Sequence, residues 1–181
     1  LLQAAGITAI ADIRTSPYSR FTPHFNRDAL QESLKQVGIA YVFLGQELGG
    51  RPKEKAFYCD GIADYEKMAK AAAFQKGLER VLSGTERHRI ALMCSEQDPL
   101  DCHRCLLVGR SLFHRHVEVE HILPDGQKRS QVAIEADLLA QSNLAEDDLF
   151  ASADERLARA YRNRAMKVAY SDDDLAAPAA E

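Results

Sequence analysis

Short apolar runs recur along residues 1–126, and polar or charged residues separate them. Three of the runs are nearly continuous, which is typical of strands inside a parallel sheet. A fourth alternates apolar and polar positions, which predicts an edge strand. The runs span residues 7–13, 39–44, 90–93 and 117–123. We expect the third run to be buried on both faces, because charged residues bound it on either side.

Amphipathic stretches fall between these runs. Residues 27–37 repeat apolar side chains at helical spacing, and Asn26 precedes them as the predicted N-cap. The same spacing predicts a helix over 62–82, broken near Ala71. A third helix is predicted over 102–114. Strands and helices therefore alternate along the chain.

This alternation predicts an α/β fold, namely a three-layer Rossmann-like domain with a mostly parallel sheet and helices on both faces. We expect this domain to cover 1–128, a helical extension to cover 129–170, and a disordered tail, acidic and rich in Ala, to cover 171–181. Residues 1–6 are typical of the last turn of a helix, so we expect the N-terminal strand of the domain to be missing.

The composition narrows the class of protein without identifying its function. The chain has 181 residues, of which 46% are hydrophobic, so it can bury one good core. Its net charge of −4 gives no global basic field of the kind that favours nucleic acids. No apolar run is long enough to cross a bilayer, and four cysteines are too sparse for a disulfide framework. We therefore expect a cytoplasmic protein with reduced thiols and no membrane partner.

Polar side chains gather where the predicted strands end. Asp12 and Arg14 lie at the exit of the first strand, and Cys94 and Glu96 follow the third. The predicted helix over 102–114 begins soon afterwards, with Asp101 as its N-cap. Because the carboxyl ends of parallel strands meet at one edge of a sheet, we expect these groups to share one crevice.

The first turn of that helix, Cys102-His103-Arg104, adds a thiol, an imidazole and a guanidinium. Free N–H groups at a helix start and forked arginine donors suit phosphate. We therefore expect an anionic ligand such as a phosphate, a nucleotide or a nucleic-acid end. The candidate ligand-binding residues are Arg14, His24, Asn26, Arg51, Cys94, Cys102 and Arg104.

Acid–base catalysis on that ligand is a further hypothesis. The candidate catalytic residues are Asp12, Glu96 and His103, with Glu96 as base and His103 as acid in a hydrolase. A pure binding module would use the same residues without turnover, so the sequence leaves open whether the protein is an enzyme. A structural interpretation competes with both, and in it the arginines pair with nearby acids. These acids are Asp12, Glu96, Asp98 and Asp101.

Cysteine chemistry gives three more hypotheses. A nucleophilic Cys94 resembles that of rhodaneses and related phosphatases, yet residues 95–100 contain neither Arg nor Gly and include two acids, so we favour a buried, inert thiol. Cys94, Cys102, His103 and Cys105 carry metal-ligand atoms, but neighbours on a helix point in different directions. The Cys102-x-x-Cys105 spacing follows a long acidic loop, which is atypical of a redox pair. We predict no metal and no cofactor.

Several motifs in a fixed order carry a family resemblance. They are Asp12-x-Arg14, His24-Phe25-Asn26, Glu47-Leu48-Gly49-Gly50, Cys94-Ser95-Glu96 with Asp98-Pro99, and Cys102-His103-Arg104. Over residues 1–126 the chain resembles the domain of unknown function 488 family. The resemblance implies a fold and a shared polar cluster, and it implies no settled activity. The Thr-Ile-Gly-His type strand with which members usually start is absent, and residues beyond Gln141 follow no pattern of the family.

An interaction protein is the alternative from another functional class. The sheet domain would then be a scaffold, and the helices of 130–170 would dock a partner. The exposed anchors would be Leu138, Leu139, Leu149 and Phe150. In the favoured hypothesis the partner is a small anionic ligand or a nucleic acid, and a homodimer is one option for the chain itself.

Overall fold

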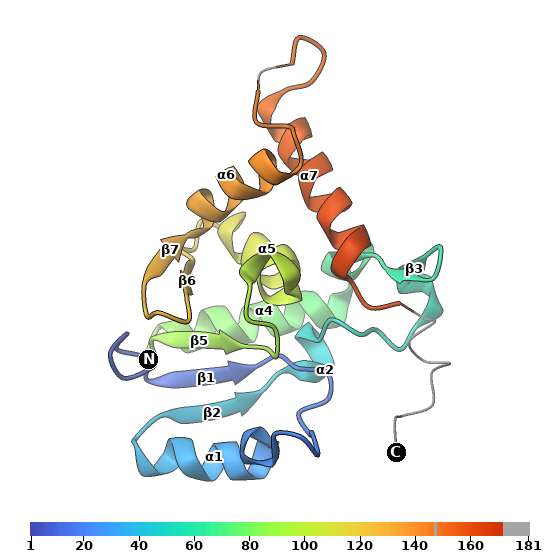
Figure 1. The fold of residues 1–181 in the computed structure, drawn as a ribbon. Helices are drawn as coiled ribbons and strands as arrows, with labels where there is room; N and C mark the ends of the chain where they lie inside the picture. The colour runs from blue at the N-terminus through green and yellow to red at the C-terminus, as the bar shows by residue number, and fades with distance from the viewer. Residues whose placement is uncertain (147, 172–181) are drawn as a thin grey trace. The chain divides into compact units, whose positions relative to one another are not determined.

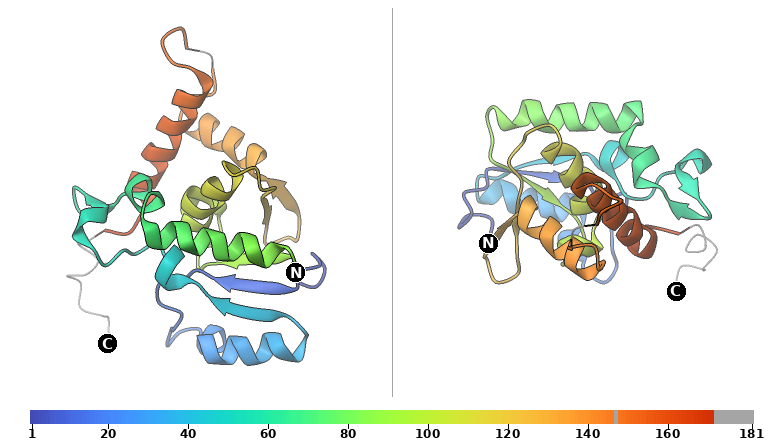
Figure 2. Two further views of the ribbon diagram at one scale, coloured as in Figure 1. Left: turned by 180° about the vertical axis from the view of Figure 1, so that it is seen from behind. Right: turned by 90° about the horizontal axis from the view of Figure 1, so that it is seen from above.

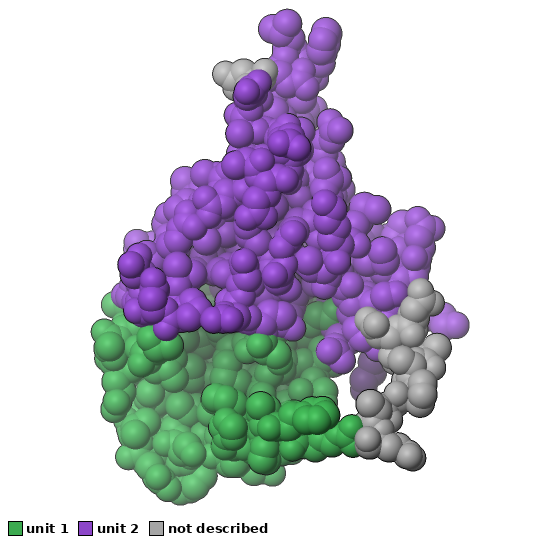
Figure 3. All heavy atoms as spheres, viewed as in Figure 1, with its two compact units in different colours: residues 1–50, 70–95 green, residues 51–69, 96–181 purple. Residues whose placement is uncertain are grey.

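The protein is described here by a computed structural model that covers residues 1–146 and 148–171. The chain falls into two compact units, and each unit is made from two stretches of sequence (Figure 3). Unit 1 comprises residues 1–50 and 70–95, and unit 2 comprises 51–69 and 96 onwards. The domain boundary predicted at residue 128 stays a prediction. Residues 172–181 of the predicted disordered tail lie outside the described residues.

A parallel three-stranded sheet forms the centre of unit 1, in the order β2-β1-β5 (Figure 1). The strands are β1 (Ala9–Asp12), β2 (Ala40–Phe43) and β5 (Ile90–Met93). All of β1 is buried, because a neighbour flanks it on each side. The burial predicted for both faces of 90–93 is wrong, since β5 is an edge strand and is only half-buried.

The helices of unit 1 are α1 (Arg27–Gln36), α2 (Gly45–Leu48) and α4 (Ala72–Thr85), and a 3-10 turn, Pro23–Phe25, precedes α1. The views in Figures 1 and 2 place α1 beside β2 and α4 beside β5. Leu30 and Leu34 of α1 are buried, as the helical spacing predicts. The helix ends at Gln36, and the next residue, Val37, is exposed, so the predicted apolar stripe is one residue too long.

The predicted helix over 62–82 is confirmed from Tyr65 onwards, as two helices, but not at its first residues. The break near Ala71 is present, and α4 begins at the next residue. Upstream of the break, in unit 2, β3 (Tyr58–Cys59) and β4 (Ile62–Ala63) form an antiparallel pair, followed by α3 (Tyr65–Ala69). Asp60 and Gly61 both adopt positive φ between these strands, and such a turn forces a hairpin in place of a helix.

Unit 2 is mainly helical and contains a second hairpin. Two 3-10 turns belong to this unit: Lys55–Phe57, which precedes β3, and η3 (Pro99–Asp101). The elements that follow η3 along the chain are the π-helix η4 (Arg104–Gly109), α5 (Arg110–Phe113), β6 (Glu120–Ile122), β7 (Lys128–Ser130), α6 (Gln131–Gln141) and α7 (Ala153–Val168). The predicted edge strand within 117–123 exists, but it pairs with β7 and not with the parallel strands. The α/β class is confirmed, whereas the three-layer Rossmann-like arrangement stays a prediction.

A chain of buried hydrogen bonds joins β6, α6 and α7 in unit 2. His121 Nε2 lies 2.8 Å from Gln131 Oε1, and Gln131 Nε2 donates to the Tyr161 hydroxyl at 2.7 Å. That hydroxyl donates in turn to Glu135 Oε1 at 2.7 Å. Each member is buried, so each would leave a costly unpaired partner if it were removed.

The buried position of His121 predicts a loss of stability in mild acid. Burial lowers the pKa of His121 below its ordinary 6.5, the positive charges of Arg104 and Arg129 lower it further, and the hydrogen bond to Gln131 opposes them. As the pH falls, the unfolded chain therefore takes up this proton first. We expect the free energy of unfolding to fall below about pH 6.5, by up to about 1.4 kcal/mol per pH unit.

Urea denaturation at a series of pH values measures this effect. The H121Q variant should lose this component of the pH dependence, because it has no proton to take up. The matched variant H114Q removes an exposed histidine of the same unit and should keep the component. Equal pH profiles for H121Q and the parent protein would contradict the prediction.

Helix α7 has a capped N-terminus, and its later turns bind η3 through hydrogen bonds and an ion pair. Ser152 and Glu155 form a reciprocal capping box at its N-terminus. From its last turns, Arg164 donates through Nε to the Leu100 carbonyl at 2.9 Å and pairs with the Asp101 carboxylate. The segment that leads into Cys102 is therefore held by α7.

The proposed docking anchors between 138 and 150 do not behave alike. Leu138 is a core residue with 1% of its surface exposed, so its assignment as an exposed anchor is wrong. Leu149 and Phe150, by contrast, are 97% and 96% exposed between α6 and α7. Within the described residues, no helix has both the length and the apolar character needed to span a membrane.

Candidate functional site

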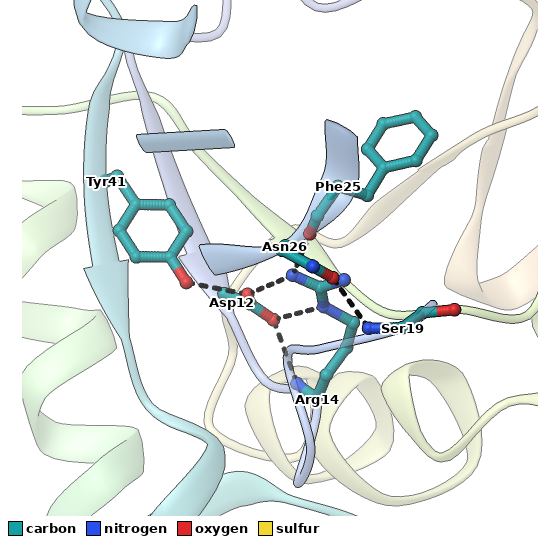
Figure 4. Close-up of polar contacts among 6 residues, drawn as sticks. All are labelled: Asp12, Arg14, Ser19, Phe25, Asn26 and Tyr41. Atoms are coloured by element: carbon teal, nitrogen blue, oxygen red, sulfur yellow. Dashed lines mark hydrogen bonds and ion pairs between the residues drawn. The ribbon is translucent and has the colours of Figure 1, made fainter. Parts of the chain in front are cut away.

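At the carboxyl end of β1, Asp12 is fully buried and accepts hydrogen bonds from two residues (Figure 4). Arg14 donates to it through Nε at 2.9 Å, through Nη2 at 2.6 Å and through its backbone N–H at 3.1 Å. The Tyr41 hydroxyl, on the neighbouring strand β2, donates at 2.7 Å. Four donors thus stabilise the Asp12 carboxylate in a place where an unpaired charge would be very costly.

Arg14 is occupied by this arrangement. Its guanidinium meets Asp12 in a forked pair, and Nη2 also donates to the Phe25 carbonyl at 2.9 Å. The hydrogen bond to Asp12 raises the pKa of Arg14, although burial opposes the shift. For Asp12 and Arg14, the structure therefore contains the ion pair that the structural interpretation predicts.

The loop before α1 is attached to the same network through Phe25. His24 is exposed, and its ring lies against that of Phe25 with centroids 4.5 Å apart. Asn26 occupies the N-cap position, but its side chain makes no capping bond, so the predicted role is wrong in that respect. Its Oδ1 accepts from the Ser19 backbone N–H at 2.6 Å, which closes the loop instead of capping the helix.

A second group of candidates lies in unit 2, at Glu96, Cys102 and His103. One ligand atom from each lies within 4.8 Å of those of the other two. The Cys102 thiol donates to Glu96 Oε2 at 3.2 Å, and the Arg104 backbone N–H donates to Cys102 Sγ at 3.3 Å. Cys102 and His103 are buried, whereas Glu96 is exposed, so the group is fixed on one side and open to solvent at Glu96.

Local backbone conformation explains how Cys102 and His103 come together. Asp98 caps η3 by accepting from the Leu100 N–H at 2.8 Å, and Pro99 starts that turn. Cys102 then ends the turn in an extended conformation, with φ −127° and ψ 133°. The predicted N-cap role of Asp101 is therefore wrong. The next helical segment follows His103, so Cys102 is not in a helix.

All four cysteines of the chain are free thiols. Cys94 belongs to unit 1, directly after β5, and is half-buried, so the full burial predicted for it is not observed. Cys105 is buried in unit 2, and Gln131 Nε2 lies 3.9 Å from its Sγ. Burial raises the pKa of Cys105 to about 12. A thiol that stays protonated is a poor nucleophile and a poor redox partner.

Arg104 differs from Arg14 in the partners of its guanidinium. Asp101 pairs with Arg164, and the Asp98 side chain is used within its own turn. Within residues 1–146 and 148–171, the half-buried Arg104 side chain has no carboxylate partner. Arg51, also of unit 2, lies with its guanidinium carbon 4.8 Å from the centre of the Tyr170 ring.

The sequence profile of a family described as Domain of unknown function DUF488 matches residues 1–110. The chain belongs to this family. The match includes every candidate residue of this DUF488 protein, from Asp12 to Arg104. No curated protein and no solved structure matches the chain. The family carries no established activity in its description, so function must be argued from the residues.

Sequence reasoning missed Tyr41, the second side chain that donates to Asp12 in this DUF488 protein. The strand over 39–44 was predicted, but the register that sets Tyr41 beside Ile10 of β1 has no local signal. The buried set around Gln131 and Tyr161 was missed as well, since each of its partners lies on a different element.

Proposed function

We propose that this DUF488 protein binds a phosphate-bearing anion, a nucleotide or a nucleic-acid end, through Arg104 in unit 2. The observation that carries the proposal is the difference between two arginines of the shared motifs. Arg14 is neutralised by a buried carboxylate, whereas the Arg104 guanidinium has none within the described residues. A half-buried arginine without a carboxylate is suited to a ligand that brings its own negative charge.

Neighbouring groups suit the chemistry of such a ligand. His103 precedes Arg104 directly, and its ring lies near the Glu96 carboxylate. An imidazole and a carboxylate whose polar atoms lie within 4.8 Å of each other can serve as acid and base on a phosphate ester. Hydrolysis of the bound ester, with Glu96 as base and His103 as acid, is therefore the reaction that we propose.

The R104A variant tests the binding step. We expect inorganic phosphate, pyrophosphate or a nucleoside monophosphate to raise the Tm of the parent protein, because a ligand that binds only the folded state stabilises it. Removing a charge-assisted hydrogen bond costs about 1.5–3 kcal/mol, so R104A should weaken binding about ten- to hundredfold. Thermal unfolding over a ligand titration measures the loss.

R159A is the control for the loss of one positive charge, because Arg159 is an exposed arginine in α7 of the same unit and has no ion-pair partner within the described residues. It removes the same charge and should leave the titration unchanged. Phosphate released from esters in the same samples reports hydrolysis, which E96Q should abolish. If none of the anions shifts the Tm of the parent protein, or if R104A titrates like R159A, the proposal fails.

A further inference from the structure

Glu96, Cys102 and His103 bring together a carboxylate, a thiol and an imidazole. These are the three ligand types that zinc takes from proteins, and a site with three protein ligands keeps a fourth position open. All three come from unit 2, within eight residues of one another in the sequence. We propose that they form a zinc site. This inference goes beyond anion binding and does not depend on it.

The spacing of the ligand atoms fits one ion. Zinc holds its ligands at about 2.0–2.3 Å, so the ligand atoms of a tetrahedral site lie about 3.3–3.8 Å apart. Cys102 Sγ and Glu96 Oε2 are 3.2 Å apart, and all three ligand atoms fall within 4.8 Å of one another.

The backbone removes the main argument against a metal here. On a helix, adjacent residues point in different directions, which is why the sequence predicts no metal. Cys102 is extended and His103 is helical, with φ −59° and ψ −22°. The change of conformation between the two residues brings both ligand atoms to the same place. The ligand set also differs from the one considered in the sequence. Cys105 contacts Gln131, and Glu96 is the third ligand beside Cys102 and His103.

Contacts around the thiol favour its metal-bound form. The proton that Cys102 shares with Glu96 is the one that zinc would displace, and both groups would then face the cation. The Arg104 backbone N–H donates to Cys102 Sγ at 3.3 Å and would continue to do so with a thiolate. With zinc bound, Glu96 and His103 would be ligands and could not act as the base and the acid of the proposed hydrolysis. The Cys94 thiol, two residues earlier in the chain, belongs to unit 1 and is not needed for this set.

Metal titration of the full chain tests the site without any assay of activity. After treatment with a chelator, the protein should bind about one equivalent of Zn²⁺ in competition with a chelating dye. Co²⁺ in its place should give a thiolate-to-cobalt charge-transfer band. C102S should lose that band, and E96Q should weaken zinc binding by at least about tenfold.

Two variants keep the test decisive. E96Q changes an exposed side chain, so it remains informative if the buried change C102S fails to fold. C59S removes an exposed thiol of the same unit and should bind both ions like the parent protein. The inference is overturned if the parent protein takes up neither ion, or if E96Q and C59S bind zinc equally well. Neither result bears on whether Arg104 binds an anion.

Discussion

Replacing Asp12 with asparagine is expected to lower the free energy of unfolding by about 3–5 kcal/mol, the range for breaking one side of a buried ion pair. Asp12 is fully buried and accepts four hydrogen bonds from Arg14 and Tyr41. Asparagine keeps the shape but removes the charge, so the largely buried Arg14 guanidinium loses its counter-ion. Urea denaturation, followed by circular dichroism, measures the change.

The control for D12N makes the same carboxylate-to-amide change at Glu79, which is exposed on α4 of the same unit. Because a surface change of this kind is worth at most about 0.5 kcal/mol, E79Q should unfold at nearly the same urea concentration as the parent protein. A D12N protein as stable as E79Q would mean that the Asp12 pair contributes little, and the structural interpretation of Arg14 would then be wrong.

The G45A variant should lose about 3 kcal/mol or more, because overpacking against a rigid neighbour is costly. A Cβ at Gly45 would lie 2.0 Å from the Arg14 carbonyl oxygen and 2.6 Å from the Phe43 ring. The carbonyl belongs to the backbone and cannot rotate aside as a flexible side chain would. The added methyl group would therefore push α2 away from the segment that carries Arg14.

G38A separates crowding from backbone strain. Gly38 adopts φ +73° and has nothing within 4 Å of the position of a Cβ, so alanine there meets strain alone. Such strain costs about 1–2 kcal/mol. The same urea experiment should therefore rank G45A below G38A in stability. The reverse order would show that α2 yields readily, and that close packing at Gly45 is not what positions it.

The central sheet of unit 1 could be predicted from the sequence because buried strands leave a local signal. The runs at 7–13, 39–44 and 90–93 each contain a strand, and the first of these strands pairs in parallel with the other two. Their register left no such signal. The contact between Tyr41 and Asp12 spans 29 positions of the chain, and the hydroxyl finds its partner only through the pairing of β1 with β2.

For the candidate residues of unit 2, the sequence indicates the cluster but predicts the wrong local backbone conformation at Cys102. The sequence pattern places Cys102 and His103 together in the first turn of a helix, but only His103 is helical. The error arises because Asp98, and not Asp101, is the capping residue, and it caps the 3-10 turn η3. Because Cys102 follows that turn in an extended conformation, its side chain and that of His103 are not separated in direction as two adjacent helical residues would be. Capping side chains three residues apart are too similar for the sequence to choose between them.

Arg164 has a consequence for how this segment can vary among related proteins. The family match ends at residue 110, but the Leu100 carbonyl within it accepts its hydrogen bond from α7, which lies beyond the match. A relative with a different C-terminal sequence must satisfy that carbonyl in another way. Evolution can therefore alter how firmly the loop before Cys102 is held without changing any residue of the shared motif.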